Sequence, residues 1–352
     1  MRAQTDNSWS LVGQVVTGAG QGAGFTQLDW ATEQFIATCG IKPYPGTLNI
    51  VLTDEPHVGT WQALKGEPGI RLRAADSDSC DARLYPIWIG AELPAAIVLP
   101  EVPGYPANQI EIIAAVPLRE QLSVGDGDRL RVTGQDFSRT KAIIFDVDGT
   151  LLNSLDGYRA AAHRAAAAYG YEVTLETVRQ ALNSNQPFWE LIIPAERAAD
   201  AEFVAQLRRE TMAHWPAAMA EHVSVLPGAE VTFRTLRDSG IRLAIFTGSD
   251  GESLPVLEDA GLLDFFDPII TGRQIKNRKP DPEGILQCLE ILATDPGESV
   301  YVGDSVIDVK ASRAAGVRSV SLLTGAGDSG SLSAAGTHRV LASLAGLADI
   351  FL

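Results

Sequence analysis

The sequence predicts two domains of different fold class: a small β-barrel, followed by a Rossmann-like, doubly wound parallel α/β sheet with a helical insertion. Before about residue 133, short apolar runs are separated by clusters of Gly, Pro and Asp, which is typical of many short strands. From Lys141 onward, strand-like runs alternate with helical patterns, which indicates βαβ units and a parallel sheet. The chain has 352 residues, which is long enough for two or three domains.

The first domain is expected at residues 1–135. One helix is expected between Thr26 and Cys39, among strands at 11–16, 48–52, 84–89, 95–99, 110–116 and 129–132. Many short strands with a single helix favour a small barrel. Residues 133–140 are polar, include Gly134 and show no periodicity, so we place the domain boundary in this segment.

The second domain is expected at residues 136–352, with its core at 141–154 and 226–352. Residues 155–225 show no strand pattern and contain alanine-rich stretches, which predicts a helical insertion. The core should place ligands at the carboxyl ends of its parallel strands. Its predicted strands are 142–145, 242–246, 268–270, 299–302 and 319–322, and its predicted helices include 230–237, 253–260, 283–291 and 309–315.

The composition disfavours several classes of partner. With 28 basic and 44 acidic residues, the formal charge of −16 would repel nucleic acids and anionic membranes, so we expect neither as a partner. The three cysteines are far apart and form neither a disulfide framework nor a CxxC metal site. No apolar run approaches the ~18 residues that span a bilayer, and the N-terminus lacks the apolar core of a signal peptide. These features predict a cytoplasmic protein that acts on small molecules.

Two carboxylates, Asp146 and Asp148, follow a predicted buried strand at spacing i, i+2. Gathering two like charges at the end of a strand is costly unless a cation or a reacting phosphate lies there. We therefore interpret the run Lys141-Ala-Ile-Ile-Phe-Asp-Val-Asp-Gly-Thr150 as a chemical site.

Three further motifs fit the same chemistry. Thr247-Gly248-Ser249 follows one predicted strand, Gly303-Asp304-Ser-Val-Ile-Asp308 follows another, and Lys279 lies in Asn277-Arg-Lys-Pro-Asp-Pro282. In phosphoryl transfer, one carboxylate can attack phosphorus, while a second protonates the leaving oxygen and then deprotonates water. A lysine and a hydroxyl can hold the phosphoryl oxygens, and Mg²⁺ prefers carboxylate and phosphate oxygens. The set therefore predicts Mg²⁺-dependent phosphoryl transfer.

These four motifs, in this order, resemble the haloacid dehalogenase superfamily of phosphohydrolases over about residues 141–325. The resemblance is to members like phosphoglycolate phosphatase, and it implies a helical cap at 155–225. It also implies that Asp146 is the nucleophile and Asp148 the acid and base. Phosphate would be bound by Thr247, Gly248 and Ser249, with Lys279 steadying the nucleophile and the phosphoryl group. The implied Mg²⁺ ligands are Asp146, the main-chain oxygen of Asp148 and Asp304, with Asp308 in support.

Alternatives within this resemblance remain open. A phosphomutase shares all of these residues, whereas a dehalogenase fits less well because Asp148 follows the phosphatase pattern. The cap is expected to select the substrate. Its candidates are Asn183, Asn185, Phe188, Trp189 and His214, each of which we interpret first as a packing or surface residue.

Two unusual stretches occur in the first domain. Gly18-Ala-Gly-Gln-Gly-Ala-Gly24 has four glycines at alternate positions, and the free N–H groups of such a loop can wrap phosphates. It is not a GxGxxG before a helix, and it lacks the lysine of a Walker A loop. In Pro43-Tyr-Pro-Gly-Thr-Leu-Asn49, a stiff turn sends Thr47 and Asn49 to the same side of a strand, where their oxygens could hold Mg²⁺. Each stretch taken singly is also consistent with an ordinary turn.

Together these stretches resemble the archaeal-type CTP-dependent riboflavin kinases, which are small cradle-loop β-barrels, from about Leu11 to Val132. The segments Ile110–Ile113, Pro117–Arg119 and Gly125–Asp128 also fit that family. The resemblance implies CTP as phosphate donor, Mg²⁺ bound by Thr47 and Asn49, and Glu111 as a base near the reacting flavin hydroxyl. The nucleotide phosphates would lie against Gly18, Ala19, Gly20, Gln21, Gly22 and Ala23, and the cytosine ring against Val116, Pro117, Leu118 and Arg119.

The barrel departs from that family at one place. Eight residues before Glu111, where the family tends to have a hydroxyl residue that helps hold the flavin phosphate, this chain has Pro103. The basic residues that usually lie nearby are also absent. The acceptor is therefore either riboflavin with weaker product binding or a different flavin-like alcohol.

Two hypotheses of function follow. In the first, the chain is bifunctional: the barrel phosphorylates riboflavin with CTP to form FMN, and the second domain hydrolyses a different phosphomonoester, since acting on FMN would waste CTP. The phosphorylated ribitylaminouracil precursor of riboflavin is one candidate, on the ground of the fusion alone. In the second, a non-catalytic barrel that binds nucleotide or flavin regulates the phosphatase.

Overall fold

The computed structural model describes residues 8–18, 22–66, 69–75, 79–90, 93–184 and 186–351. The chain divides into two compact units. The first comprises Met1–Arg139, Arg339–Ala342 and Asp349–Leu352, and the second comprises Thr140–His338 and Ser343–Ala348. None of the described helices is both long and apolar enough to cross a membrane.

The first unit contains a closed antiparallel barrel, which confirms the predicted fold class. Pairing between its first and last strands, β4 and β7, closes the sheet on itself. The six strands, in barrel order, are β4 (Ala82–Ile89), β5 (Leu93–Pro100), β6 (Gln109–Ala114), β2 (Leu48–Val51), β1 (Ser8–Val16) and β7 (Arg129–Gln135). A seventh strand, β3 (Ile70–Leu72), pairs with β4 outside the closed ring.

Alternation along the strands builds two apolar layers in this unit. Ile50, Ile97 and Ile112 lie in the barrel core, together with Trp61 from helix α3 (Glu55–Gly66). The next side chains along the strands point outward, and Ile113 packs there with Phe35 of helix α2 (Asp29–Cys39). Two short helices, α1 (Gly22–Phe25) and α4 (Leu118–Leu122), complete the described elements of the barrel.

Several details of this unit differ from the sequence prediction. Helices α3 and α4 and strand β3 were not expected, α2 begins at Asp29 rather than near Thr26, and β6 ends at Ala114 rather than at residue 116. Strand β7 continues to Gln135, so part of the expected linker is strand. Gly134 lies in that strand opposite Trp9 of β1, and the position requires glycine because a Cβ there would lie 2.0 Å from the ring of Trp9.

The second unit is built on a sheet with the strand order β12 (Ile269–Ile270), β11 (Arg242–Phe246), β8 (Ala142–Phe145), β13 (Ser299–Gly303) and β14 (Arg318–Leu322). A further strand, β15 (Arg339–Leu341), consists of residues that the division above assigns to the first unit. The pairs from β12 to β14 are parallel, which confirms the predicted class. Strand β15 was not predicted. The chain proceeds outward from β8 in one direction and then returns beside it as β13, so β8 lies at the topological switch point, where open α/β sheets bind ligands.

Helices flank this sheet in the predicted alternation. They are α9 (Ala229–Asp238), α10 (Leu254–Asp259), α11 (Glu283–Leu292), α12 (Val306–Ala314) and α13 (Ser329–Ala335). Strand β8 is buried along its whole length, as expected for a strand covered by helices on both faces.

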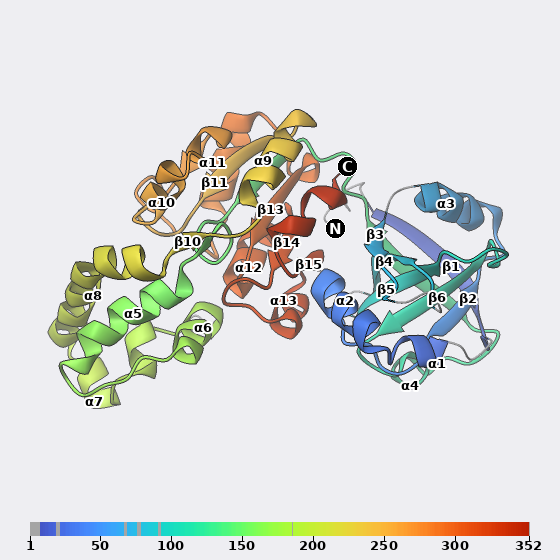
Figure 1. The fold of residues 1–352 in the computed structure, drawn as a ribbon, viewed down its shortest axis with the longest axis horizontal. Helices are drawn as coiled ribbons and strands as arrows, with labels where there is room; N and C mark the ends of the chain where they lie inside the picture. The colour runs from blue at the N-terminus through green and yellow to red at the C-terminus, as the bar shows by residue number, and fades with distance from the viewer. Residues whose placement is uncertain are drawn as a thin grey trace. The chain divides into compact units, whose positions relative to one another are not determined.

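The insertion is helical, as predicted. Figure 1 shows its helices in green to yellow, gathered together at one side of the sheet: α5 (Leu155–Ala167), α6 (Leu175–Ser184), α7 (Ala195–Ala198) and α8 (Ala201–His222). The alanines of α5 let it approach α8 closely, and Ala160 and Ala161 pack on Trp215 and Ala218. One short strand, β10 (Ser224–Val225), pairs with β9 (Leu152–Asn153) at the base of the insertion, within a region expected to contain no strand. We call residues 155–225 the cap.

Candidate active sites

The sequence motifs of the second unit meet at the carboxyl edge of its sheet. Asp146 follows β8, Thr247 follows β11 and Asp304 follows β13, and β8 pairs with both of the other strands. The N–H of Asp146 donates to the main-chain oxygen of Val302 over 2.9 Å, which continues the β8–β13 ladder to the carboxylate. The sheet thus brings together residues that lie up to 158 positions apart.

Lys279 joins two of the carboxylates. Its Nζ donates to Asp146 Oδ1 over 2.6 Å and to Asp308 Oδ1 over 2.8 Å. The ammonium also lies 5.0 Å from the ring centre of Phe246 and 5.2 Å from that of Tyr301, and its side chain is 8% exposed. The two aromatic rings and the two carboxylates hold the ammonium of Lys279 beside Asp146.

Asp304 is held by neutral donors. Thr150 Oγ1 donates to its Oδ1 over 3.0 Å, and the N–H of Ala326 donates to its Oδ2 over 2.8 Å. A Cβ at Gly149, whose φ is +82°, would lie 2.6 Å from Asp304 Oδ2, and a Cβ at Gly325 would lie 1.9 Å from it. Any residue larger than glycine at either position would displace the carboxylate of Asp304.

Asp308 has a structural role as well as a position near the cluster. It forms the capping box of α12 with Ser305, whose Oγ donates to Asp308 Oδ2 over 2.6 Å. Its other oxygen, Oδ1, accepts from Lys279. The motif Gly303–Asp308 therefore both starts a helix and aims a carboxylate at the site.

The cluster carries more negative than positive charge. One oxygen from each of Asp146, Asp304 and Asp308 lies within 4.8 Å of the others, and all three residues are buried. Burial raises the pKa of Asp146 well above the usual aspartate value; Lys279 opposes that rise, while Asp308 and Asp304 add to it. Burial, with Asp308 adding to it, raises the pKa of Asp304 to about 7. Three carboxylates facing one ammonium are suited to a bound cation.

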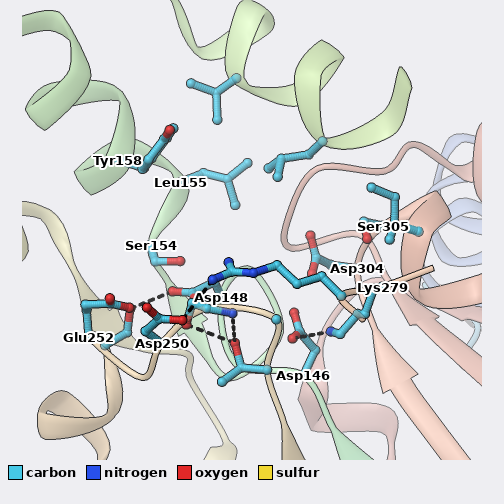
Figure 2. Close-up of a pocket in the computed structure, with 18 of the residues that line it drawn as sticks. Asp146, Asp148, Ser154, Leu155, Tyr158, Asp250, Glu252, Lys279, Asp304 and Ser305 are labelled. Carbon is cyan, nitrogen blue, oxygen red and sulfur yellow. Dashed lines mark hydrogen bonds and ion pairs between the residues drawn. The ribbon is translucent and has the colours of Figure 1, made fainter. Parts of the chain in front are cut away.

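Asp148 lies apart from that cluster and faces different partners. Its Oδ1 accepts a hydrogen bond from Ser253 Oγ over 2.8 Å, and Ser154 lies on its other side (Figure 2). Burial raises the pKa of Asp148, and the hydrogen bonds from Ser253 and Ser154 oppose the rise. A carboxyl group that holds its proton more readily is suited to act as a general acid. Ser253 and Ser154 were not among the residues singled out in the sequence.

Thr247 and Ser249 form a small hydroxyl cluster. Their oxygens lie 3.1 Å apart, and the N–H of Ser249 donates to Thr247 Oγ1 over 3.2 Å. Thr247, Gly248 and Ser249 all line the same cavity as Asp146 and Asp148. The structure thus places every residue of the second unit that was predicted to be catalytic, to bind phosphate or to bind metal around one space.

That space is a cavity of about 730 Å³, with the core residues on one side and the cap on the other. Figure 2 shows Leu155 and Tyr158 on a cap helix, facing Asp146 and Lys279 across it. Further cap residues line it that sequence analysis did not identify, because they are spaced along helices without a chemical motif. These are Val178, Leu182, Arg208, Thr211, Met212 and Trp215.

The cap residues proposed from the sequence lie in different environments. Trp189 lines the cavity, whereas Phe188 packs on Tyr158 within the cap and His214 is not part of the lining. Asn183 donates through Nδ2 to the main-chain oxygen of Ala326 over 2.7 Å, so it links cap to core. Asn185 lies outside the described residues.

The polar residues of the barrel meet across β2 and β6. Asn49 lies opposite Glu111 in the register of these strands. Glu111 accepts from Thr47 Oγ1 over 3.1 Å at one carboxylate oxygen and from Tyr105 OH over 3.0 Å at the other. Asn49 Nδ2 is 3.2 Å from Thr47 Oγ1, so a hydroxyl, an amide and a carboxylate lie side by side. The structure brings together the three residues predicted to bind Mg²⁺ and the reacting hydroxyl.

Gly18 lies directly against this group. A Cβ at Gly18 would be 2.4 Å from Asn49 Nδ2, so any larger residue would displace the amide. Ala19, Gly20 and Gln21 lie outside the described residues, and Gly22 and Ala23 begin α1. The start of the glycine-rich stretch is therefore adjacent to the Thr47–Asn49–Glu111 group.

The Val116–Arg119 segment, which was predicted to bind the cytosine ring, is partly buried in the barrel. Leu118 is buried in the barrel core, Val116 packs against that core, and Pro117 precedes α4. Arg119 donates to the main-chain oxygen of Val16 over 3.0 Å and pairs with Asp126 over 2.7 Å. Of these four residues, Leu118 has its side chain buried in the core, and Arg119 has its side chain bonded to other groups of the barrel.

Tyr105 and two basic residues were missed in the sequence. Tyr105 stands two residues after Pro103 and supplies a hydroxyl at Glu111. It also lines a second cavity, of about 320 Å³, together with Lys65 and Arg83. These cations come from α3 and β4, so the segment around Pro103 gave no sign of them.

Comparison with known proteins matches the two units separately. A family model described as haloacid dehalogenase-like hydrolase matches residues 143–322, just over half of the chain. A model named for CTP-dependent riboflavin kinases, and described as a domain of unknown function, DUF120, matches residues 15–133.

Individual relatives follow the same division. A phosphoglycolate phosphatase of Cereibacter sphaeroides is 38% identical over 182 residues, covering 50% of this chain and 82% of that protein. A riboflavin kinase of Methanocella arvoryzae is 40% identical over 121 residues, which are 34% of this chain but only 55% of that protein. A solved haloacid dehalogenase-like hydrolase from Bacteroides fragilis superposes with a TM-score of 0.53 at 26% identity, covering 59% of this chain and 99% of that one.

Proposed function

The chain belongs to the haloacid dehalogenase-like hydrolases, and on that premise we propose that its second unit hydrolyses a phosphomonoester through an aspartyl-phosphate on Asp146. We propose further that the first unit transfers a phosphate from CTP to riboflavin or a similar flavin alcohol. The observation that carries the phosphatase proposal is the position of Asp146, bonded to Lys279 and beside Asp304 and Asp308, at the floor of a cavity that Asp148 also lines.

The hydrolysis has two steps. A carboxylate oxygen of Asp146 attacks phosphorus, the bond from phosphorus to the alcohol oxygen breaks, and Asp148 gives its proton to that oxygen. Water then attacks the aspartyl-phosphate, Asp148 takes a proton from it, and the Asp146–phosphorus bond breaks to release inorganic phosphate. Thr247, Ser249 and Lys279 hold the phosphoryl oxygens during both steps.

Mg²⁺ fits the acidic cluster of this unit. Three buried carboxylates face a single ammonium, and two glycines leave room for Asp304 where a Cβ would collide with it. The ion would be held by Asp146, Asp304 and the main-chain oxygen of Asp148, with Asp308 in support through Lys279. When bound, it supplies positive charge that offsets the repulsion between an anionic substrate and the carboxylates.

In the barrel, Glu111 would accept the proton of the flavin hydroxyl as that oxygen attacks the γ-phosphorus of CTP and CDP leaves. The contacts from Thr47 and Tyr105 to the two oxygens of Glu111 support this role, because they fix the carboxylate in place. Thr47 and Asn49 offer neutral oxygens for Mg²⁺ beside that carboxylate. Lys65 and Arg83 line the cavity next to Tyr105, where Arg83 is paired with Glu101 over 3.0 Å. Lys65 therefore offers positive charge on this side of Glu111, where the sequence around Pro103 has none.

The two activities would have different substrates, since hydrolysis of FMN by the same chain would undo the kinase step at the cost of CTP. We propose a phosphorylated precursor of riboflavin, the ribitylaminouracil phosphate, as the physiological phosphomonoester. The support for this choice is the joining of the two units in one chain.

The test uses the full chain with Mg²⁺. Riboflavin and CTP should yield FMN, and a panel of the precursor, FMN, phosphoglycolate and sugar phosphates should yield phosphate. Asp146→Asn should abolish phosphate release and leave FMN formation intact, whereas Asn49→Ala should do the reverse. Absence of preference for the flavin-pathway compounds would refute the proposed substrate.

One observation favours a second candidate, a barrel that only senses ligand: Pro103 replaces the hydroxyl residue expected to hold the flavin phosphate. In that case the wild-type chain makes no FMN, and riboflavin or CTP changes the rate of phosphate release.

A further inference from the structure

We propose that the cap cavity selects phosphomonoesters whose alcohol carries an uncharged, apolar, ring-sized body, in preference to short anionic esters such as phosphoglycolate. This inference rests on the phosphatase activity proposed above and specifies its substrate class. It follows from the lining, the charge and the size of the cavity.

The cap side of the cavity is apolar. Leu155, Leu182, Met212 and two tryptophans, Trp189 and Trp215, line it opposite the catalytic carboxylates. Leu182 is 40% exposed and Met212 is 46% exposed, although both are large hydrophobic residues. Exposed apolar side chains that gather around a cavity mark a binding surface, and the flexible methionine can adapt to a ring.

The charges of the cavity disfavour a second anionic group on the substrate. Its lining contains six carboxylates and three basic side chains. Two of the three cations are already paired: Lys279 bonds Asp146 and Asp308, and Arg278 bonds Asp250 over 2.9 Å. Only Arg208, which is exposed on α8, makes no hydrogen bond or ion pair among the described residues. Four of the six carboxylates belong to the catalytic centre, where the proposed Mg²⁺ would offset their charge. A substrate carboxylate that extends toward the cap would therefore depend on Arg208 alone for a cationic partner among the described lining residues.

The cavity is large while the cap is attached to the core. Asn183 of the cap donates to Ala326 over 2.7 Å, so the volume of about 730 Å³ belongs to a cap in contact with the core. Cavities of roughly 300 to 1,000 Å³ enclose ligands of drug size. A two-carbon acid would leave most of this space to water, whereas a ring would cover Leu182 and Met212.

The test is a series of esters of primary alcohols, whose leaving groups are alike: ethyl, butyl, 2-phenylethyl and 2-(1-naphthyl)ethyl phosphate, with phosphoglycolate. The expected kcat/KM rises with the apolar body, by about tenfold or more from ethyl to 2-phenylethyl phosphate, and phosphoglycolate stays below 2-phenylethyl phosphate. Leu182→Ser and Met212→Ser should each reduce kcat/KM for 2-phenylethyl phosphate several-fold, and by a larger factor than kcat/KM for ethyl phosphate. Val231→Ser, at an exposed apolar residue of α9 outside the cavity, should change neither.

The inference would be overturned if kcat/KM were the same for all esters of the series. It would also be overturned if phosphoglycolate were the best substrate and its hydrolysis were lost in Arg208→Gln. Failure of the phosphatase proposal has a separate signature, namely no phosphate release from any ester by the wild-type chain. In that event, calorimetric binding of the same esters to the Asp146→Asn variant still decides the inference. Tighter binding of 2-phenylethyl than of ethyl phosphate supports it, and equal binding refutes it.

Discussion

The side-chain amide of Asn183 donates a hydrogen bond to the main-chain oxygen of Ala326 over 2.7 Å, and the N–H of Ala326 donates to Asp304 Oδ2 over 2.8 Å. One peptide unit on either side of Ala326 thus connects the cap to a carboxylate of the acidic cluster. Ala326 therefore both bonds the cap to the core and holds the carboxylate of Asp304.

Asn183→Ala should weaken both the cap contact and the phosphatase reaction. The variant loses the hydrogen bond to Ala326 and a longer one, in which Asn183 Oδ1 accepts from the N–H of Val306 over 3.5 Å. Loss of about 0.5 to 1.5 kcal/mol for the shorter bond alone predicts a fall of at least about two- to tenfold in kcat/KM for phosphate release. Amide hydrogen exchange in α6 should become faster, because the helix loses its link to the core. Unchanged exchange and unchanged kinetics would contradict a role for this contact.

Lys279→Met should destabilise the second unit. The substitution leaves Asp146 and Asp308 buried without their ammonium partner, which typically costs about 3 to 5 kcal/mol in the free energy of unfolding. Arg278→Met is the matched control, because Arg278 is 62% exposed and its pair with Asp250 should contribute less than about 1 kcal/mol. Denaturant unfolding measures both, and equal losses for the two variants would argue against a buried ionic role for Lys279.

Gly18→Ala should impair FMN formation and spare phosphate release. Its Cβ would lie 2.4 Å from Asn49 Nδ2, and Asn49 is buried, so the amide must move away from Thr47. An overpacking cost of about 1 to 3 kcal/mol predicts a loss of roughly tenfold or more in the rate of FMN formation. Gly24→Ala is the control within the same glycine-rich stretch, since no described heavy atom lies within 4 Å of its Cβ. Similar rates in both variants would count against the proposed position of the Mg²⁺ ligands.

Tyr105→Phe should slow the kinase reaction without unfolding the barrel. The variant removes the donor at one oxygen of Glu111 and keeps the ring, and a hydrogen bond to a charged group contributes about 1.5 to 3 kcal/mol. We expect kcat for FMN formation to fall by about tenfold or more, with little change in the KM for CTP. Tyr44→Phe, at an exposed tyrosine of the same unit, should behave as wild type. A kcat that stays at the wild-type value would show that Thr47 alone positions Glu111.

His338 should make the stability of the second unit dependent on pH. Its Nδ1 accepts a hydrogen bond from the N–H of Ser319 over 3.0 Å, and burial, with Arg318 and Arg313 adding to it, lowers its pKa to about 4. Because the folded pKa lies below that of the unfolded chain, this contribution is complete above pH ~6.5 and is lost as the pH falls toward 4, by on the order of 3 kcal/mol. In His338→Gln, the loss of unfolding free energy over the same interval should be smaller. If the free energy of unfolding falls equally with pH in the wild type and in His338→Gln, then His338 is not the source of the pH dependence.

The sequence pattern was sufficient for most of the fold. The strand that leads to Asp146 is a continuous apolar run, and burial on both faces of a parallel sheet accounts for that pattern. The pattern failed where packing outweighed local composition. Gly134 looked like part of a linker, but it lies in β7 opposite Trp9, and it is glycine because the ring of Trp9 occupies the space of a Cβ. Strand β15 has three residues, too few to show a period.

The chemistry of both sites could likewise be predicted where it depends on side chains at fixed positions after a strand. Asp146, Thr247 and Asp304 follow parallel strands that are neighbours in the sheet, so their convergence follows from topology. Tyr105, Arg83 and Met212 gave no such signal. Each lies in a segment of ordinary composition and becomes part of a site only through the element that packs beside it.

By itself, the sequence determined the kind of chemistry this protein can perform: the carboxylates, the lysine and the Thr47–Asn49–Glu111 group are recognisable because their types and order are local facts of the chain. Only the tertiary structure decided what surrounds that chemistry. The apolar cap wall opposite Asp146, the link from Asn183 to Asp304 through Ala326, and the hydroxyl of Tyr105 at Glu111 depend on contacts between separate elements. Such contacts are set by long-range packing of particular side chains, which neither periodicity nor motif spacing records.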